Sequence, residues 1–362
     1  MNAPTKNAAV APAAISFMLD GKSVQAFEGE SILKAAERSG VCIPHLCYKD
    51  GLRADGNCRA CVVEIKGERT LAPSCCRQVS AGMQVQAGSE RARKSQKLVL
   101  EMLLSDMPDT GYKWNDAQAL ANQPSTATAV PGGKQVDALC SHHEETGLPP
   151  GADRAVASTR SAGQHGELSL WADRMGVSVR PELKALRREQ PKADVSHPAM
   201  AVNLDACIQC NRCVRACREE QVNDVIGYAM RGSYSAIVFD LNDPMGDSTC
   251  VACGEFVQAC PTGALMPKTE IGSQIVDKKV DSVCPFCGVG CLLTYNVKDN
   301  RIVSVAGRDG PANHSRLCVK GRFGFDYAHS PQRLTVPLIR KAGVPKDPEA
   351  LNHLNKDTAD WS

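Results

Sequence analysis

Eighteen cysteines dominate the chemistry available to this chain of 362 residues. In a small secreted protein they would form disulfides. In a chain of this length, in which we find no secretory signal, thiols are expected to stay reduced, so clustered cysteines favour metal binding. Most of them fall into three groups, at positions 42–76, 207–260 and 284–318. Zinc, which also takes cysteine pairs two residues apart, is the alternative to iron–sulfur chemistry.

The first group has the spacing of a [2Fe–2S] site, with two thiolates for each iron. Its predicted ligands are Cys47, Cys58, Cys61 and Cys75. The two-residue gap lets Cys58 and Cys61 curl towards one iron, while the other two ligands reach the second iron from separate loops. Cys42 is left out because the gap that follows it does not fit, and Cys75 is preferred to its neighbour Cys76 by spacing alone.

The second group contains a complete bacterial [4Fe–4S] run and an internal repeat. Three cysteines of the run recur 43 positions later, which predicts two homologous halves that face each other. In two-cluster domains the fourth cysteine of each run binds the other cluster. The first cubane is therefore predicted to be held by Cys207, Cys210, Cys213 and Cys260.

The second cubane of this unit lacks a ligand. Its predicted thiolates are Cys217, Cys250 and Cys253, and Phe256 occupies the position of the fourth. Phenylalanine cannot bind iron. The ligand count leaves three outcomes open: a three-iron cluster, a four-iron cluster with a foreign ligand, or no cluster.

The third group predicts another [4Fe–4S] cluster. Its ligands are Cys284, Cys287, Cys291 and Cys318. Lys320 follows the last ligand by two residues, either as a solvated lysine or as a charged group between this cluster and a second cofactor. The spacing does not separate these two interpretations. The chain shows no motif for nucleophilic catalysis or phosphate binding, so we expect no catalytic residue in it.

Hydrophobic patterning predicts a modular α+β chain. Strands are expected at 15–19, 22–26, 62–65 and around Val85, with helices at 31–39 and 89–105, which together form a small mixed sheet with a long cysteine-bearing loop. Further helices are expected at 167–175 and 181–189. Strand residues follow each half of the repeat and recur at 235–241, and a hairpin is expected at 291–305.

Charge and hydropathy exclude some partners. The chain carries 42 basic and 40 acidic residues, a net charge of +2, so its charge predicts neither a nucleic-acid nor an anionic-membrane partner. No apolar run is long enough to span a bilayer.

The order of these motifs resembles the N-terminal part of the catalytic subunit of cytoplasmic, NAD-dependent formate dehydrogenases that contain molybdenum or tungsten. Residues 43–48 and 56–61 look like the [2Fe–2S] loop shared with the large peripheral subunit of bacterial complex I. Residues 260–265 resemble the end of a two-cluster ferredoxin insert. Residues 284–291 and 317–324 are similar to the cluster domain of pterin-dependent oxidoreductases.

This resemblance implies a β-grasp [2Fe–2S] ferredoxin domain, a two-cluster bacterial ferredoxin-like domain and a small pterin-oxidoreductase [4Fe–4S] domain. Formate would be oxidised to carbon dioxide at a bis-pterin centre of molybdenum or tungsten, which the sequence does not distinguish. Electrons would pass through the clusters, with Lys320 between the last cubane and the pterin. The implied partners are a flavin- and NAD-binding iron–sulfur subunit of the diaphorase type and pterin-binding catalytic domains.

The chain departs from the family at three places. Phe256 replaces a ligand. Gly166 stands where the family has a cysteine of a cluster held by one His and three Cys, so we expect no such cluster here. The sequence ends where large pterin-binding domains are expected, which indicates a fragment or domains carried by another chain. Two alternative functions remain, the complex I large peripheral subunit and a stand-alone, non-catalytic electron-transfer protein.

The predicted organisation has six segments. They are a disordered tail at 1–14, the [2Fe–2S] domain at 15–105, a linker with a degenerate His-cluster region at 106–199, the ferredoxin-like domain at 200–270, the pterin-oxidoreductase type domain at 278–340, and the start of a pterin domain or a tail at 341–362.

Overall fold

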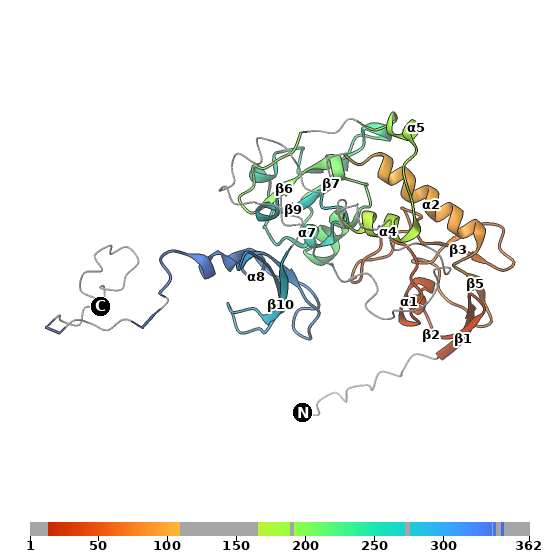
Figure 1. Cartoon of the computed structure of the whole chain (residues 1–362), viewed down its shortest axis with the longest axis horizontal. Coiled ribbons are helices and arrows are strands. Elements are labelled where there is room, and N and C mark those ends of the chain that lie inside the picture. The colour runs from red at the N-terminus through yellow and green to blue at the C-terminus, as the bar shows by residue number, and fades with distance from the viewer. Residues whose placement is uncertain are drawn as a thin grey trace, which may run out of the picture.

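The computed structural model describes residues 14–108, 166–188, 192–271, 276–334, 336–337 and 342–343. Within these ranges the chain forms three units in sequence order, coloured red to orange, green to teal, and blue in Figure 1. In that view the middle unit lies between the other two. Each unit carries one of the three cysteine groups.

The first unit is a mixed five-stranded sheet with two helices. The strand order is β2-β1-β5-β3-β4, in which β1 and β5 are parallel and the other neighbours antiparallel. Phe17, Leu19, Leu33, Val63 and Val85 form the centre of its core. The elements are β1 (Ala14–Leu19), β2 (Lys22–Phe27), α1 (Ile32–Arg38), β3 (Val62–Ile65), β4 (Ala72–Pro73), β5 (Gln84–Gln86) and α2 (Glu90–Ser105).

Side-chain caps explain where both helices of this unit begin. The Ser31 hydroxyl accepts a hydrogen bond from the backbone N–H of Lys34 at 3.3 Å, and Ser89 accepts one from Ala92 at 3.1 Å. Each cap satisfies a backbone donor that the first turn leaves unpaired. The predicted helices at 31–39 and 89–105 are present within one or two residues of these bounds.

Two helices connect the first and middle units, α4 (Glu167–Met175) and α5 (Pro181–Lys184). Helix α4 packs Leu168 and Trp171 against Leu100 of α2, and it ends at Gly176 in the left-handed conformation (φ 61°). Its predicted bounds are confirmed.

The second of these helices was predicted too long. We expected it to continue to residue 189, whereas α5 ends at Lys184, and residue 189 itself lies outside the described ranges. Ion pairs just beyond the end account for the difference. Arg187 lies 3.1 Å from Asp205, and the Arg188 backbone N–H and guanidinium both bind the Asp106 carboxylate.

The middle unit is built from two antiparallel strand pairs, β6 with β9 and β7 with β8. Two short helices, one in each half of the repeat, pack against each other and against a core that contains Met200, Ile226, Phe239 and Leu265. The elements are β6 (Met200–Val202), α6 (Arg212–Arg215), β7 (Ile226–Ala229), β8 (Ala236–Phe239), α7 (Glu255–Ala259) and β9 (Leu265–Pro267). A π-helical turn (Ala216–Glu220) extends α6, and 3-10 turns lie at Leu204–Ala206, Gly232–Tyr234, Met245–Asp247 and Lys268–Glu270.

The third unit is an antiparallel three-stranded sheet in the order β10-β11-β12. The predicted hairpin is present as β11 and β12, but β10 was not predicted. Most residues of β10 are exposed, so its sequence lacks the alternation that marks a half-buried strand. The elements are β10 (Lys278–Val283), β11 (Leu292–Lys298), β12 (Arg301–Gly307), α8 (Val319–Phe323) and a 3-10 turn at Gly324–His329.

Candidate metal centres

The structure brings the four cysteines of the first group together around the loop that follows α1. Cys61 directly precedes β3, and Cys75 follows β4, so the sheet fixes the positions of both. The backbone N–H of Cys47 donates to the Cys58 sulfur at 3.4 Å. Cys75 is buried, whereas Cys76 is exposed with its sulfur 3.6 Å from that of Cys75.

The thiols of this group are close enough to perturb one another. Contacts with Cys58 and Cys75 lower the pKa of the Cys47 thiol to about 2, and contact with Cys75 lowers the pKa of Cys61 to about 7. The same contacts raise the pKa of the thiols of Cys58 and Cys75. Two of the four thiols, those of Cys47 and Cys61, therefore ionise readily, and the thiolate is the metal-binding form of cysteine.

A buried hydroxyl beside these thiols lacks a partner. Ser74 is fully buried next to Cys75, and its Oγ has no hydrogen-bond partner among the described residues. Buried hydroxyls in folded proteins are normally paired. A sulfur-rich cluster held by the four thiolates would provide an acceptor, so the residues present fit a [2Fe–2S] group.

The two halves of the middle unit repeat their backbone conformation as well as their cysteines. Gln209 and its counterpart Ala252 both have φ 54°, and both donate a backbone N–H to the preceding cysteine sulfur at 3.4 Å. Asn211 and Gly254, the next pair, are also left-handed, with φ 66° and 72°. The helices α6 and α7 then begin at equivalent positions, so the predicted repeat is present in three dimensions.

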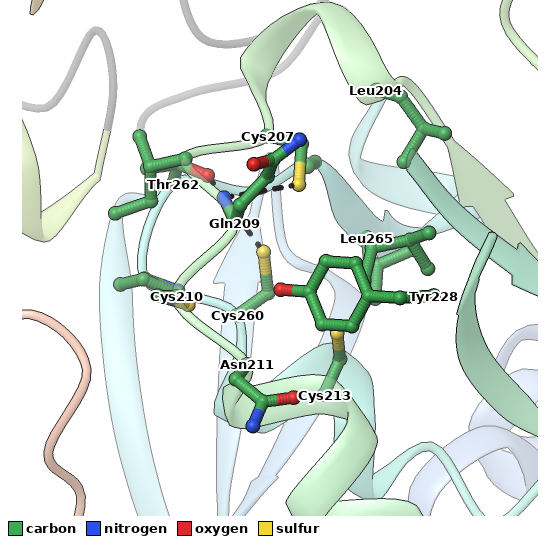
Figure 2. Close-up of a pocket in the computed structure, with 14 residues that line it drawn as sticks. Leu204, Cys207, Gln209, Cys210, Asn211, Cys213, Tyr228, Cys260, Thr262 and Leu265 are labelled. Carbon is green, nitrogen blue, oxygen red and sulfur yellow. Dashed lines mark hydrogen bonds between the residues drawn. The ribbon is translucent and has the colours of Figure 1, made fainter. Parts of the chain in front are cut away.

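In the first half, the four predicted ligands surround one cavity. Figure 2 shows the sulfurs of Cys207, Cys260 and Cys213 around this cavity. Cys210 completes the set. Burial raises the pKa of the Cys207 thiol to about 11 and that of Cys210 to about 12. A cationic iron centre would offset this cost of ionising buried thiols, so the donor set fits a cubane.

Tyr228 of β7 also lines this cavity, and its hydroxyl points into it (Figure 2). Burial and the neighbouring thiols of Cys213, Cys207 and Cys210 raise the pKa of the phenol well above its ordinary value. The hydroxyl therefore keeps its proton at neutral pH and remains a hydrogen-bond donor.

In the second half, a phenylalanine ring fills the equivalent position. Phe256 is 2% exposed, lies on α7 where α6 carries Cys213, and packs against Phe239 with ring centroids 6.3 Å apart. The Cys217 thiol donates to the backbone carbonyl of Asn223 instead. The side chains present here do not fit a complete four-thiolate cubane.

The third group lies at one end of the small sheet and is partly open to solvent. Cys284 is buried, whereas Cys287 and Cys318 are exposed. Burial, followed by the nearby thiols of the other three ligands, raises the pKa of Cys291, so all four predicted ligands lie close together. Lys320 is exposed on α8, two residues beyond Cys318.

Hydrogen bonds join the first two cysteine groups directly. The Asn57 amide donates to the Cys210 carbonyl at 3.3 Å. In the other direction, Arg215 donates to the Cys47 carbonyl at 2.5 Å and to that of Cys210 at 3.5 Å. The Asn57 and Arg215–Cys47 bonds each join a side chain of one ligand loop to the backbone of the other, and the bond to Cys210 holds Arg215 in its own loop, so the fold fixes the relative position of the two cysteine groups.

A buried ion pair supports this junction. Arg212 of α6 donates to the Leu46 carbonyl at 3.0 Å and to the Glu167 carboxylate at 2.7 and 3.0 Å. Burial alone would raise the pKa of Glu167, but the Arg212 guanidinium lowers it below its ordinary value. Cysteine spacing did not predict Arg212, Arg215 or Asn57; the only signal for them is that each lies within two residues of a predicted ligand.

Gly166 stands where a cysteine of the additional His-containing cluster is expected. A cysteine there would require the surrounding backbone to rearrange. Gly166 has φ 57° and ψ −135°, and a Cβ placed there would lie 2.3 Å from the carbonyl oxygen of Pro261. That oxygen accepts a hydrogen bond from Glu167 N–H at 2.7 Å. His165 and the linker at 109–165 lie outside the described residues, so the absence of this cluster stays a prediction.

We expect Gly166→Ala to destabilise the protein by at least about 3 kcal/mol, because it combines a backbone conformation suited to glycine with a steric overlap. Gly176→Ala is the matched control, since Gly176 is also left-handed (φ 61°) but a Cβ there meets no atom within 4 Å. The control should cost only about 1 kcal/mol. Chemical denaturation of both variants measures the difference, and equal losses would contradict the proposed overlap.

Three domain families match the chain. Residues 12–90 match the 2Fe-2S iron-sulfur cluster binding domain, and 197–266 match the ferredoxin-like domain of NADH-quinone oxidoreductase subunit 3. Residues 277–330 match the molybdopterin oxidoreductase Fe4S4 domain. The chain is built from three iron–sulfur domains. The predicted fold class is thereby confirmed.

Curated relatives are similar along most of the chain but are much longer. The chain is 28% identical to an NADH-quinone oxidoreductase subunit of Rhizobium meliloti over 91% of its length. It is 27% identical to NADPH-Fe(3+) oxidoreductase subunit alpha of Geobacter sulfurreducens over 90%. A Staphylococcus haemolyticus protein provisionally named a formate dehydrogenase is 25% identical, also over 90%. The chain spans 33%, 33% and 32% of these relatives, about a third of each.

A solved structure gives a similar fold. It is an NAD+-reducing [NiFe]-hydrogenase in the H2-reduced state, with a TM-score of 0.52 and 25% sequence identity. The match covers 74% of this chain and 92% of that chain. Among the described residues, no helix is both long and apolar enough to cross a membrane.

Proposed function

We propose that this chain is the electron-transfer part of an NAD(P)-linked oxidoreductase, with one [2Fe–2S] and two [4Fe–4S] clusters. The observation that carries the proposal is the cavity enclosed by four buried or half-buried cysteines in the middle unit. The clusters supply one-electron redox chemistry. The ligand sets are Cys47, Cys58, Cys61 and Cys75; Cys207, Cys210, Cys213 and Cys260; and Cys284, Cys287, Cys291 and Cys318.

The chain's own residues hold the neighbouring centres at fixed positions. Asn57 and Arg215 tie the first two ligand loops together, and Arg322 of α8 joins the third unit to α7 of the middle unit. Backbone amides directed at cysteine sulfurs, such as that of Gln209, further adjust the potential. These side-chain hydrogen bonds would thus connect all three units in a chain without the additional His-containing cluster.

Formate is the substrate that we propose for the complete enzyme. The motif order resembles that of formate dehydrogenases, and the third unit matches a molybdopterin oxidoreductase domain. A bis-pterin molybdenum or tungsten centre would be held by pterin-binding domains next to the exposed side of the third cysteine group, with Lys320 close to that side. A flavin- and NAD-binding subunit would accept the electrons.

NADH oxidation with electron delivery to a quinone-reducing complex is the second candidate. It is favoured by the match of residues 197–266 to an NADH-quinone oxidoreductase domain and by 28% identity to a curated subunit of such an enzyme. The complete enzyme, captured through a tag on this chain, should distinguish the two. Formate-dependent dye reduction together with bound molybdenum or tungsten supports the first candidate. NADH-dependent quinone reduction without these metals supports the second.

Iron and sulfide analysis of the anaerobically reconstituted chain tests the proposal itself. We expect iron and sulfide for one [2Fe–2S] and two [4Fe–4S] clusters, with matching EPR signals after reduction. Cys210→Ser should remove the signal of the middle cubane alone, and Cys76→Ser, which changes an exposed cysteine outside the ligand sets, should remove none. A colourless, iron-free wild-type chain, or one that binds zinc in place of iron, would refute the proposal.

A further inference from the structure

Tyr228 lies at the boundary between solvent and the cavity of the middle unit. It comes from β7, and the residue is 41% exposed, yet its side chain lines the space between the four cysteines. Figure 2 shows the ring beside Leu265 and Cys213, with the hydroxyl directed inwards towards Cys260. One edge of the ring therefore faces water while its polar end faces the thiols.

Each of the other polar side chains around this cavity donates a hydrogen bond to another protein group. The Thr262 hydroxyl donates to the Ala206 carbonyl at 2.6 Å, and the Asn211 amide donates to Asp55 at 2.9 Å. The Gln209 amide donates to the Ser235 carbonyl. The Tyr228 hydroxyl donates to none of the described protein groups.

We propose that Tyr228 is a positioning residue for the cubane held by Cys207, Cys210, Cys213 and Cys260. Its hydroxyl donates a hydrogen bond to a cluster or ligand sulfur, and its ring covers the side of the cavity that would otherwise be open to water. This inference rests on the proposed function, because it requires a cluster in this cavity.

Both parts of the side chain have a defined effect. A hydrogen bond to sulfur stabilises the more negative, reduced cluster and raises its reduction potential. Loss of a hydrogen bond to a charged group should change the reduced-to-oxidised ratio at least about tenfold. The ring acts separately, by limiting the access of water and oxygen.

Two substitutions separate these effects. Tyr228→Phe keeps the ring and removes the hydroxyl, whereas Tyr228→Ala removes both. Tyr234→Phe is the matched control, because Tyr234 lies in the turn between β7 and β8, is 78% exposed and does not line the cavity.

The experiment is an EPR redox titration of the reconstituted chain, with the middle cubane identified by the signal that Cys210→Ser removes. Tyr228→Phe should leave the iron content unchanged and lower the reduced-to-oxidised ratio about tenfold at fixed potential, a shift of about 59 mV for one electron. Tyr228→Ala should, in addition, lose iron faster in air. Tyr234→Phe should match the wild type in both measurements.

The outcomes distinguish this inference from the proposed function. If the wild-type chain has no signal that Cys210→Ser removes, the proposed function fails at this centre. If that signal is present but Tyr228→Phe titrates like Tyr234→Phe, the hydroxyl makes no such bond and the inference is overturned. An equal rate of iron loss in air for Tyr228→Ala and Tyr228→Phe would overturn the shielding role of the ring.

Discussion

Replacing Phe256 with cysteine is expected to raise the iron content of the reconstituted chain by about four atoms. The position is equivalent to that of Cys213 on the other helix of the repeat, and three further thiols of a second cubane, Cys217, Cys250 and Cys253, are already present. The substitution replaces a buried ring by a thiol and so provides both a fourth ligand and space. Iron and acid-labile sulfide analysis, together with EPR of the reduced chain, measures the gain.

Phe256→Ser is the matched control for this prediction. It loses the same packing against Phe239, and a comparable truncation of a buried phenylalanine costs about 3–5 kcal/mol, but it offers no thiolate. Both variants should therefore be destabilised before reconstitution, and only the cysteine variant should gain iron and regain stability with it. If the two variants bind the same amount of iron, the missing ligand is not what prevents this half of the repeat from binding a cluster.

The parts of the fold that could be predicted are those set by local chemistry. Ser31 caps its helix directly before the apolar residues Ile32 and Leu33, and the helix predicted from the apolar residues of 89–105 is present as α2. The 43-residue repeat reappears as left-handed residues at Gln209 and Ala252 and as two helices in register. In these cases a few neighbouring residues determine the conformation, so the sequence pattern is sufficient.

The parts that could not be predicted depend on contacts between units. Arg212 and Arg322 are charged residues, which are ordinarily exposed, but both are buried here because a carboxylate from a distant segment faces each of them. The position of Tyr228 also depends on the folded structure, since only the folded hairpin places it over the cavity. Cysteine spacing indicates where a cluster could be held, but it does not show which side chains join one centre to the next.

One such buried contact lies at the junction between the middle and third units, beside the hydrogen bonds of Gln258 to Gly307 and Ser315. Arg322 of α8 donates to the Cys253 carbonyl at 2.9 Å, to Gln258 at 2.7 Å and to the Glu255 carboxylate at 2.6 Å. Side-chain exposure is 2% for Arg322 and 4% for Glu255. The backbone of Gly254 (φ 72°) approaches so closely that a Cβ there would lie 2.1 Å from the Arg322 side chain. The guanidinium thus connects α8, next to Cys318, with the helix that leads to Cys260.

We expect Arg322→Met to destabilise the chain by about 3–5 kcal/mol, because it removes the closest ionic partner of the buried Glu255 carboxylate and leaves only Arg316, at 3.9 Å. Thermal unfolding and limited proteolysis measure the effect, and the third unit should become cleavable from the rest. The exposed pair Arg218–Asp224, with 53% and 72% exposure, gives the control Arg218→Met, which should cost no more than about 1 kcal/mol.

A double variant tests whether the loss comes from the unpaired charge. In Arg322→Met with Glu255→Gln, the buried carboxylate is gone, so the double variant should be more stable than Arg322→Met alone. The Glu255 side chain also accepts a hydrogen bond from Leu317 N–H at 3.2 Å, which glutamine can retain through its carbonyl oxygen. If Arg322→Met is no more destabilising than Arg218→Met, the ion pair does not hold the two units together, and their spacing must depend on the remaining contacts between them.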